Sequence, residues 1–238
     1  MTKLEEVLYE KVRMVMSGWD EEGIYAVSFF VEANMAYEYG GYYNVSAFSV
    51  GYNTEADCEN AGIHSERRWN YAFWRHDNTP ILEPEDESPE MKLLFDWYKE
   101  IGLENIGQWN EETGDPVGYP ELVQQVANVA RRFQEEGFLK KKFGRSIPII
   151  VHDLEYVDCT REATAYANPN GEAEDFFPAW ESEPADNAAP GAIPDMAKNI
   201  LRDPAMLEKL LKASPWTPRE YMMDMLKELS EQGNGNER

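Results

Sequence analysis

A histidine and two carboxylates follow an apolar run in this sequence, and this pattern is the one best suited to chemistry. The run 147–151 (IPIIV) is typical of a buried strand, and it leads directly into His152, Asp153 and Glu155. A histidine beside carboxylates can bind a divalent metal or transfer protons. The alternative, which we expect, is structural: His152 satisfies its ring nitrogens at the strand end while the acids face water. His152, Asp153 and Glu155 stay as candidate catalytic residues.

A dense aromatic segment, SERRWNYAFW, begins at residue 65. If this segment is a helix, Trp69 and Phe73 share one face, and Tyr71 and Trp74 share another. Two aromatic faces on one short helix exceed what a single core needs. Trp69, Tyr71 and Trp74 are therefore candidate binding residues, because aromatic side chains often anchor interfaces. The alternative, which we favour for most of them, is packing in the core.

Acidic residues outnumber basic ones two to one in this chain. The 45 Asp and Glu residues against 22 Lys and Arg residues give a formal net charge of −23. This charge repels nucleic-acid phosphates and anionic membranes and attracts basic proteins. We expect a basic protein partner, no direct nucleic-acid binding and no membrane binding; the alternative is that the acidity serves only solubility. The acidic residues selected for partner binding are Asp86, Glu87, Glu172, Glu174 and Asp175.

Standard metal and cofactor motifs do not occur in the sequence. It has no Gly-rich phosphate loop, no Gly-x-Ser-x-Gly elbow and no His-Glu-x-x-His helix. His64 and His76 flank the aromatic segment near Asp57 and Asp77, but their spacing matches no standard metal cluster. We therefore predict no cofactor and no metal site.

The cysteines and the basic residues carry weaker indications. Neither Cys58 nor Cys159 has a histidine within five residues in the sequence that would activate it as a nucleophile. A disulfide between them stays open. The basic run 140–145 interrupts the acidic pattern, and we expect it to neutralise nearby carboxylates. It could instead cover a helix C-terminus or contact an anionic ligand.

Hydrophobic periodicity predicts the elements that hold these residues. Apolar residues at helical spacing predict helices at 3–19, 65–74, 91–101 and 120–138. Apolar or alternating runs predict strands at 24–31, 43–52 and 147–151, the first two paired as neighbours. The predicted fold class is α+β, with a mixed or antiparallel sheet of about four to six strands covered by helices.

The composition changes towards the C-terminus. We expect a core domain over residues 1–180, an acidic Pro-rich linker over 181–195 and a C-terminal extension of short helices over 196–238. No segment has the roughly 20 apolar residues of a membrane-spanning helix, and the N-terminus lacks a signal-peptide core. Two cysteines do not make a secreted disulfide framework, so we expect a cytoplasmic protein.

Three segments of the chain resemble an uncharacterised bacterial family. They are 24–55 (IYAVSFFVEANMAYEYGGYYNVSAFSVGYNTE), 65–77 (SERRWNYAFWRHD) and 147–156 (IPIIVHDLEY). In that family a strand pair precedes a Trp-x-x-x-x-Trp helix, which corresponds here to Trp69 and Trp74. The resemblance covers residues 3–178 and supplies no reaction and no catalytic residues. In general character the chain is similar to the small acidic immunity or antitoxin proteins encoded beside bacterial toxins.

Three functions follow from these patterns, and binding is the one we expect. An immunity-type or antitoxin-type protein would use its carboxylates and exposed aromatic residues to block a basic toxin such as a nuclease. The first alternative is a small metal-dependent or acid–base enzyme centred on His152, Asp153 and Glu155. That hypothesis fails if His152 is buried with both ring nitrogens satisfied. The second alternative is a scaffold or oligomerisation protein that acts through the C-terminal helices.

Overall fold

The protein divides into two compact units, residues 1–181 and 182–238. The computed structural model describes residues 2–33, 38–84, 88–154, 158–178, 200–202, 204, 206–208, 219, 222–223 and 226–227. The predicted linker, 181–195, lies outside these residues. Within the second unit, a small buried cluster contains Ile200, Leu207, Met222 and Leu226. The first unit carries the surfaces discussed below.

A four-stranded mixed sheet forms the centre of the first unit, with strand order β5-β4-β1-β8. Its strands are β1 (Ile24–Glu32), β4 (Ala47–Thr54), β5 (Thr79–Leu82) and β8 (Ile149–His152). β1 pairs antiparallel with β4 and parallel with β8, and β5 pairs antiparallel with β4. The predicted α+β class with a mixed sheet is confirmed. Strand β5 was missed because Pro80 reads as a loop residue, yet proline is compatible with an edge strand.

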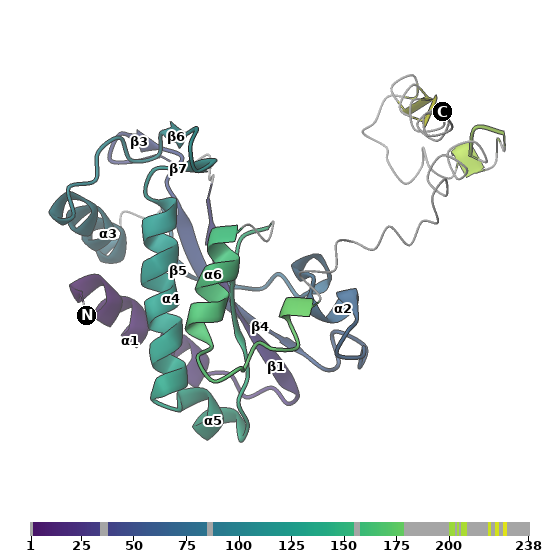
Figure 1. Ribbon diagram of the computed structural model, residues 1–238, viewed down its shortest axis with the longest axis horizontal. Helices are drawn as coiled ribbons and strands as arrows, with labels where there is room; N and C mark the ends of the chain where they lie inside the picture. Colours follow the sequence, from purple (N-terminus) through teal and green to yellow (C-terminus); the bar gives the residue numbers. More distant parts are fainter. Residues whose placement is uncertain are drawn as a thin grey trace, which may run out of the picture. The chain divides into compact units, whose positions relative to one another are not determined.

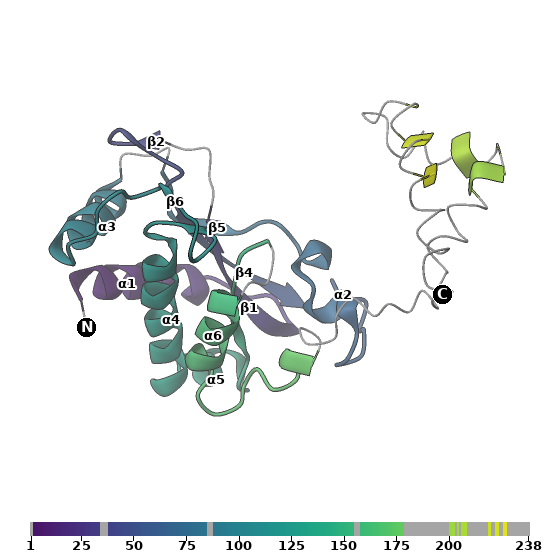
Figure 2. The same cartoon turned by 45° about the horizontal axis from the view of Figure 1, so that its top comes forward.

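Helices cover one face of this sheet (Figures 1 and 2). They are α1 (Lys3–Ser17), α3 (Pro89–Glu100), α4 (Tyr119–Glu135), α5 (Phe138–Phe143) and α6 (Asp158–Ala167). The central helix α4 packs against α1, α6, β1 and β8. Val27, Phe29 and Val31 of β1 point into the resulting core, as the period of two in a strand requires. None of the described helices is long and apolar enough to cross a membrane.

The aromatic segment covers the opposite face of the sheet, in two short pieces instead of one helix. These are α2 (Glu66–Trp69) and the 3₁₀ helix η1 (Tyr71–Phe73). The prediction of a continuous helix over 65–74 was wrong because Asn70 adopts an extended backbone, and its side chain accepts a hydrogen bond from the Ala72 N–H at 2.9 Å. An asparagine side chain competes with helix in this way by capping the next turn.

Two small hairpins lie side by side at one end of the sheet (Figures 1 and 2). The first pairs β2 (Glu38–Tyr39) with β3 (Tyr42–Tyr43), and the second pairs β6 (Trp109–Asn110) with β7 (Asp115–Pro116). The predicted strand 43–52 was therefore shifted, because the long strand starts only at Ala47. The segment 102–118, whose Gly, Asn and acidic residues indicate a loop, contains the second hairpin. We call this region the hairpin end.

Helix α6, which the sequence did not predict, closes the outer edge of β8. The Asn168 side chain accepts a hydrogen bond from the Ile149 N–H at 3.0 Å and donates one to the Ile149 carbonyl at 2.7 Å. One turn earlier, the Thr164 hydroxyl bonds the Val151 N–H at 3.0 Å and the Val151 carbonyl at 2.8 Å. These two side chains replace the hydrogen bonds of a fifth strand, so the edge offers no free pairing groups at these positions.

Candidate protein-binding surface

His152 is part of a buried polar pair with Ser28. The His152 side chain is 0% exposed and contacts the rings of Tyr71 and Phe30, with centroid distances of 4.5 and 5.4 Å. Its Nε2 lies 2.8 Å from Ser28 Oγ, and its Nδ1 lies 2.9 Å from the Asp153 carbonyl oxygen. Because a carbonyl only accepts, Nδ1 carries the proton and Nε2 accepts the Ser28 hydroxyl. Burial lowers the pKa of His152 to about 4, so the ring is neutral.

His152 is thus buried with both ring nitrogens in hydrogen-bond contact, as the structural alternative expects. The serine–histidine contact resembles a nucleophile and its base, but the side chains of Ser28 and His152 are both buried. Asp153 accepts hydrogen bonds from the Ala33 and Leu154 N–H groups at 3.1 and 2.6 Å, which is a structural role. Glu155 lies outside the described residues. The pair therefore positions β8 against β1.

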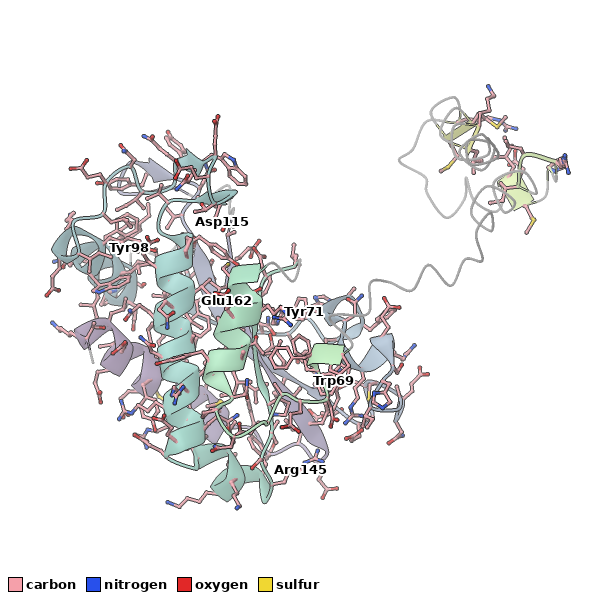
Figure 3. The ribbon with its side chains drawn as sticks, viewed as in Figure 1. Trp69, Tyr71, Tyr98, Asp115, Arg145 and Glu162 are labelled. Carbon is pink, nitrogen blue, oxygen red and sulfur yellow. The ribbon has the colours of Figure 1, made fainter. Side chains whose placement is uncertain are left out.

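The aromatic candidates lie in the core between the sheet and α2 (Figure 3). Trp69, Tyr71 and Trp74 are each buried, and both tryptophans donate an indole hydrogen bond to a backbone carbonyl, of Ile63 and Arg68 respectively. The burial of these three side chains is what the packing alternative expects.

The acidic candidates fall in two places. Asp86 and Glu87 lie outside the described residues. Glu172, Glu174 and Asp175 belong to a segment whose Ala173 and Phe176 pack into the aromatic cluster beside Trp69. Glu174 and Asp175 are exposed, whereas Glu172 is half-buried and accepts hydrogen bonds from Asn170. The structure does not bring this segment to the hairpin end.

The remaining sequence candidates take structural positions. Asp57 binds Arg75 at 2.6 Å, and no group of three or more His, Cys, Asp or Glu side chains among the described residues is arranged to hold a metal ion. Cys58 and Cys159 are free thiols, and burial raises the pKa of Cys159 to about 11. In the basic run, Lys142 donates to the carbonyl of Ser17 at 2.7 Å, the last residue of α1. That contact matches the helix C-terminus alternative.

Two large aromatic side chains are exposed at the hairpin end. Tyr43 is 65% exposed and Trp109 is 59% exposed, and they come from β3 and β6. The neighbouring Tyr39 and Tyr42 pack instead on Phe95 of α3, with centroid distances of 4.8 and 5.1 Å. The first hairpin is thus anchored through Tyr39 and Tyr42, while Tyr43 points away from the core.

A close backbone contact holds the two hairpins together. The Asn44 side chain donates a hydrogen bond to the Gly107 carbonyl at 3.1 Å. Gly107 has a φ of +77°, and a Cβ at this position would collide with the Tyr43 carbonyl oxygen. Only glycine combines that backbone conformation with such an approach. Gly107 therefore sets the relative placement of Tyr43 and Trp109.

The segments that form the hairpin end contain acidic residues and no basic ones. Glu104, Glu111 and Glu112 are exposed, and within the described part of the chain they form no ion pair. Asp115 is half-buried beside them (Figure 3), and burial raises the pKa of its carboxyl group. The sequence contains no lysine or arginine between Arg13 and Arg67, or between Lys99 and Arg131. Both hairpins lie within these two intervals.

Sequence reasoning missed Tyr43 and Trp109 because nothing local marks them as exposed. Tyr43 is the first residue of the predicted strand 43–52, and Trp109 lies in a segment without periodicity, so neither position was assigned to an exposed face. The two long intervals without Lys or Arg could have been read from the sequence. They show which segments carry acidic residues without basic ones, whereas the net charge describes only the whole chain.

Substituting Gly107 tests how the hairpins are joined. We expect Gly107→Ala to separate them, because alanine is strained at this φ and its Cβ would displace the Tyr43 carbonyl, at a cost of about 1–3 kcal/mol. Amide hydrogen exchange should accelerate at 104–117 and 38–46 and stay unchanged in α4. Gly102→Ala is the matched control: its φ is +74° and no atom lies near the added Cβ. Equal effects of the two substitutions would contradict the close-contact role.

Comparison of the chain with protein-family models, with curated proteins and with solved structures gave no match.

Proposed function

We propose that this chain is an acidic protein-binding module of the immunity or antitoxin type, which neutralises a basic partner through its hairpin end. The observation that carries this proposal is the exposure of Tyr43 and Trp109 together, on two joined hairpins whose segments contain acidic and no basic residues. Exposed tyrosine and tryptophan side chains supply much contact area at low entropic cost and are enriched among interface hot spots.

The surrounding carboxylates fit the rim of such an interface. Charged residues are depleted at interface centres and tolerated at rims, where they steer association more than they add affinity. Glu104, Glu111 and Glu112 follow or flank the aromatic residues and face solvent. Basic nucleases attract phosphates, and exposed carboxylates satisfy the same cationic cleft. The partner class we propose is therefore a basic toxin such as a nuclease.

A capture experiment with matched variants tests this function. The tagged full-length chain, a Tyr43→Ala/Trp109→Ala variant and a Met14→Ala/Phe73→Ala control are each used as bait in nuclease-treated native extract. Met14 and Phe73 are also large and exposed, at 71% and 46%, but they lie on α1 and η1. We expect the wild-type and control baits to retain one basic protein at equal stoichiometry. Loss of two hot spots should weaken binding at least tenfold, because each is worth about 2 kcal/mol.

Two further readouts decide the proposal. The captured protein should lose its own toxicity or nuclease activity when the chain is added. Its association rate should fall steeply with salt, and more so for wild type than for a Glu104→Gln/Glu111→Gln/Glu112→Gln variant. The control is an Asp20→Gln/Glu22→Gln/Glu162→Gln variant, which removes the same formal charge from exposed residues outside the hairpin end. Equal capture by the aromatic double variant, or equal salt dependence of both acid variants, would refute the hairpin end as the binding surface.

A further inference from the structure

A small hollow lies on the sheet face opposite the large helices, and its volume is about 190 Å³. Phe30 and Pro80 form apolar parts of its wall, Ser49 and Asn78 contribute polar parts, and Glu32 and Glu83 contribute carboxylates. Pockets for small molecules usually measure about 300–1,000 Å³. This hollow is below that range and has the size class of a single side chain.

The topology places the hollow beside the hairpin end. Glu32 is the last residue of β1, Glu83 follows the last residue of β5, and β4 begins at Ala47, which also lines the hollow. Because β4 runs antiparallel to both β1 and β5, the end of β1, the end of β5 and the start of β4 lie at the same end of the sheet. Only the three residues 44–46 lie between β3, which carries Tyr43, and the start of β4 at Ala47.

The acceptor groups of the hollow are carboxylates. The Asn78 amide nitrogen donates to the Tyr71 hydroxyl at 2.8 Å and to Ser49 Oγ at 3.4 Å, and its carbonyl oxygen packs against Gly51, so Asn78 is a fixed part of the wall. Glu32 and Glu83 add carboxylate oxygens. Burial, and then the charges of Asp153 and Glu83, raise the pKa of the Glu32 carboxyl group. A cation in the hollow would reduce the repulsion among these carboxylates, and its attraction would offset the cost of burying Glu32.

We propose that this hollow receives one arginine side chain of the basic partner. The apolar stem would lie between Phe30 and Pro80, and the guanidinium group would reach Glu32 and Glu83. Arginine suits the site better than lysine, because a planar guanidinium pairs with carboxylates through several donors and packs against an aromatic ring. The inference rests on the proposed function for the identity of the partner as a protein, but the hollow itself can be tested without that partner.

The probe is N-acetyl-arginine-amide, with N-acetyl-citrulline-amide as its neutral counterpart of nearly equal shape. Backbone-amide NMR shifts of the full-length protein are recorded while each probe is added. We expect saturable shifts at Ser49 and Asn78 with the arginine probe, and at least tenfold weaker binding of the citrulline probe. In a Glu32→Gln/Glu83→Gln variant the arginine probe should also bind at least tenfold more weakly. A Glu22→Gln/Glu162→Gln control, with the same charge change, should bind it as wild type does.

The outcomes separate this inference from the function on which it rests. No saturable shift with arginine, equal binding of citrulline, or an equal loss in both acid variants would overturn the arginine site. Native-like dispersion of the amide spectrum in both variants shows that a loss is not caused by unfolding. If the hollow fails while capture still depends on Tyr43 and Trp109, the binding surface stands without this anchor. If arginine binds but no basic protein is captured, the hollow stands and the proposed function fails.

Discussion

Replacing Asn168 by leucine is expected to lower the free energy of unfolding by about 3–5 kcal/mol. The Asn168 side chain makes four hydrogen bonds in the buried edge of β8. It accepts from the Ile149 N–H and from the Gln134 amide, each at 3.0 Å, and it donates to the carbonyls of Ile149 and Thr164 at 2.7 and 2.8 Å. Leucine has a similar size but leaves all four partners without Asn168, and an unsatisfied buried polar group costs about 1–3 kcal/mol.

Urea denaturation of both proteins measures this change directly. Asn170→Leu is the matched control, because Asn170 lies two residues away, is exposed and bonds only the neighbouring Glu172 among the described residues. We expect the control to change stability by less than about 1 kcal/mol. Similar losses for Asn168→Leu and Asn170→Leu would show that the side-chain closure of the β8 edge contributes little.

Acid is expected to destabilise the protein through His152 before the carboxylates titrate. The pKa of this histidine is about 4 in the folded protein, against about 6.5 in the unfolded chain. Between these two pKa values the unfolded state binds more protons than the folded state. The contribution of neutral His152 to the free energy of unfolding is therefore fully present above pH 6.5 and declines as the pH falls towards 4. The expected loss from this group is roughly 2 kcal/mol between pH 7 and pH 5.

The slope of stability against pH identifies the residue responsible. His152→Gln keeps a hydrogen-bonding side chain beside Ser28 but cannot titrate, so the decline between pH 7 and pH 5 should largely disappear. A His64→Gln/His76→Gln variant removes the other two histidines of the sequence and should keep the wild-type slope. Glu32 and Asp115 have raised pKa values and act in the opposite direction, which favours the folded state as the pH falls. A His152→Gln protein with an unchanged slope would exclude the buried histidine as the source.

The same two residues separate structural from functional roles. His152 is the last residue of β8, and Asn168 bonds the backbone of this strand. Both side chains make their hydrogen bonds within the fold. Both are buried. The side chains of Tyr43 and Trp109 and several carboxylates at the hairpin end instead face solvent.

Local patterns were enough to predict the main elements of the fold. The apolar runs at 24–31 and 147–151 form β1 and β8, and the helical periodicity at 120–138 forms α4 and the start of α5. These segments were predictable because a buried strand and an amphipathic helix each require a characteristic pattern of apolar residues along the chain. The acidity, and with it the expectation of a basic partner, also follows from composition alone.

Only the tertiary structure decided which aromatic and polar side chains face solvent. Trp69 and Trp109 are the same residue type, yet one packs against Phe176 and the other is exposed on a hairpin. The contact between Ser28 and His152 joins residues 124 positions apart, so no sequence spacing could indicate that His152 is buried and neutral. Burial and pairing depend on what the folded chain places opposite each side chain. For that reason the sequence alone determined the α+β framework and the charge of this protein, while tertiary packing decided which aromatic and acidic side chains face solvent.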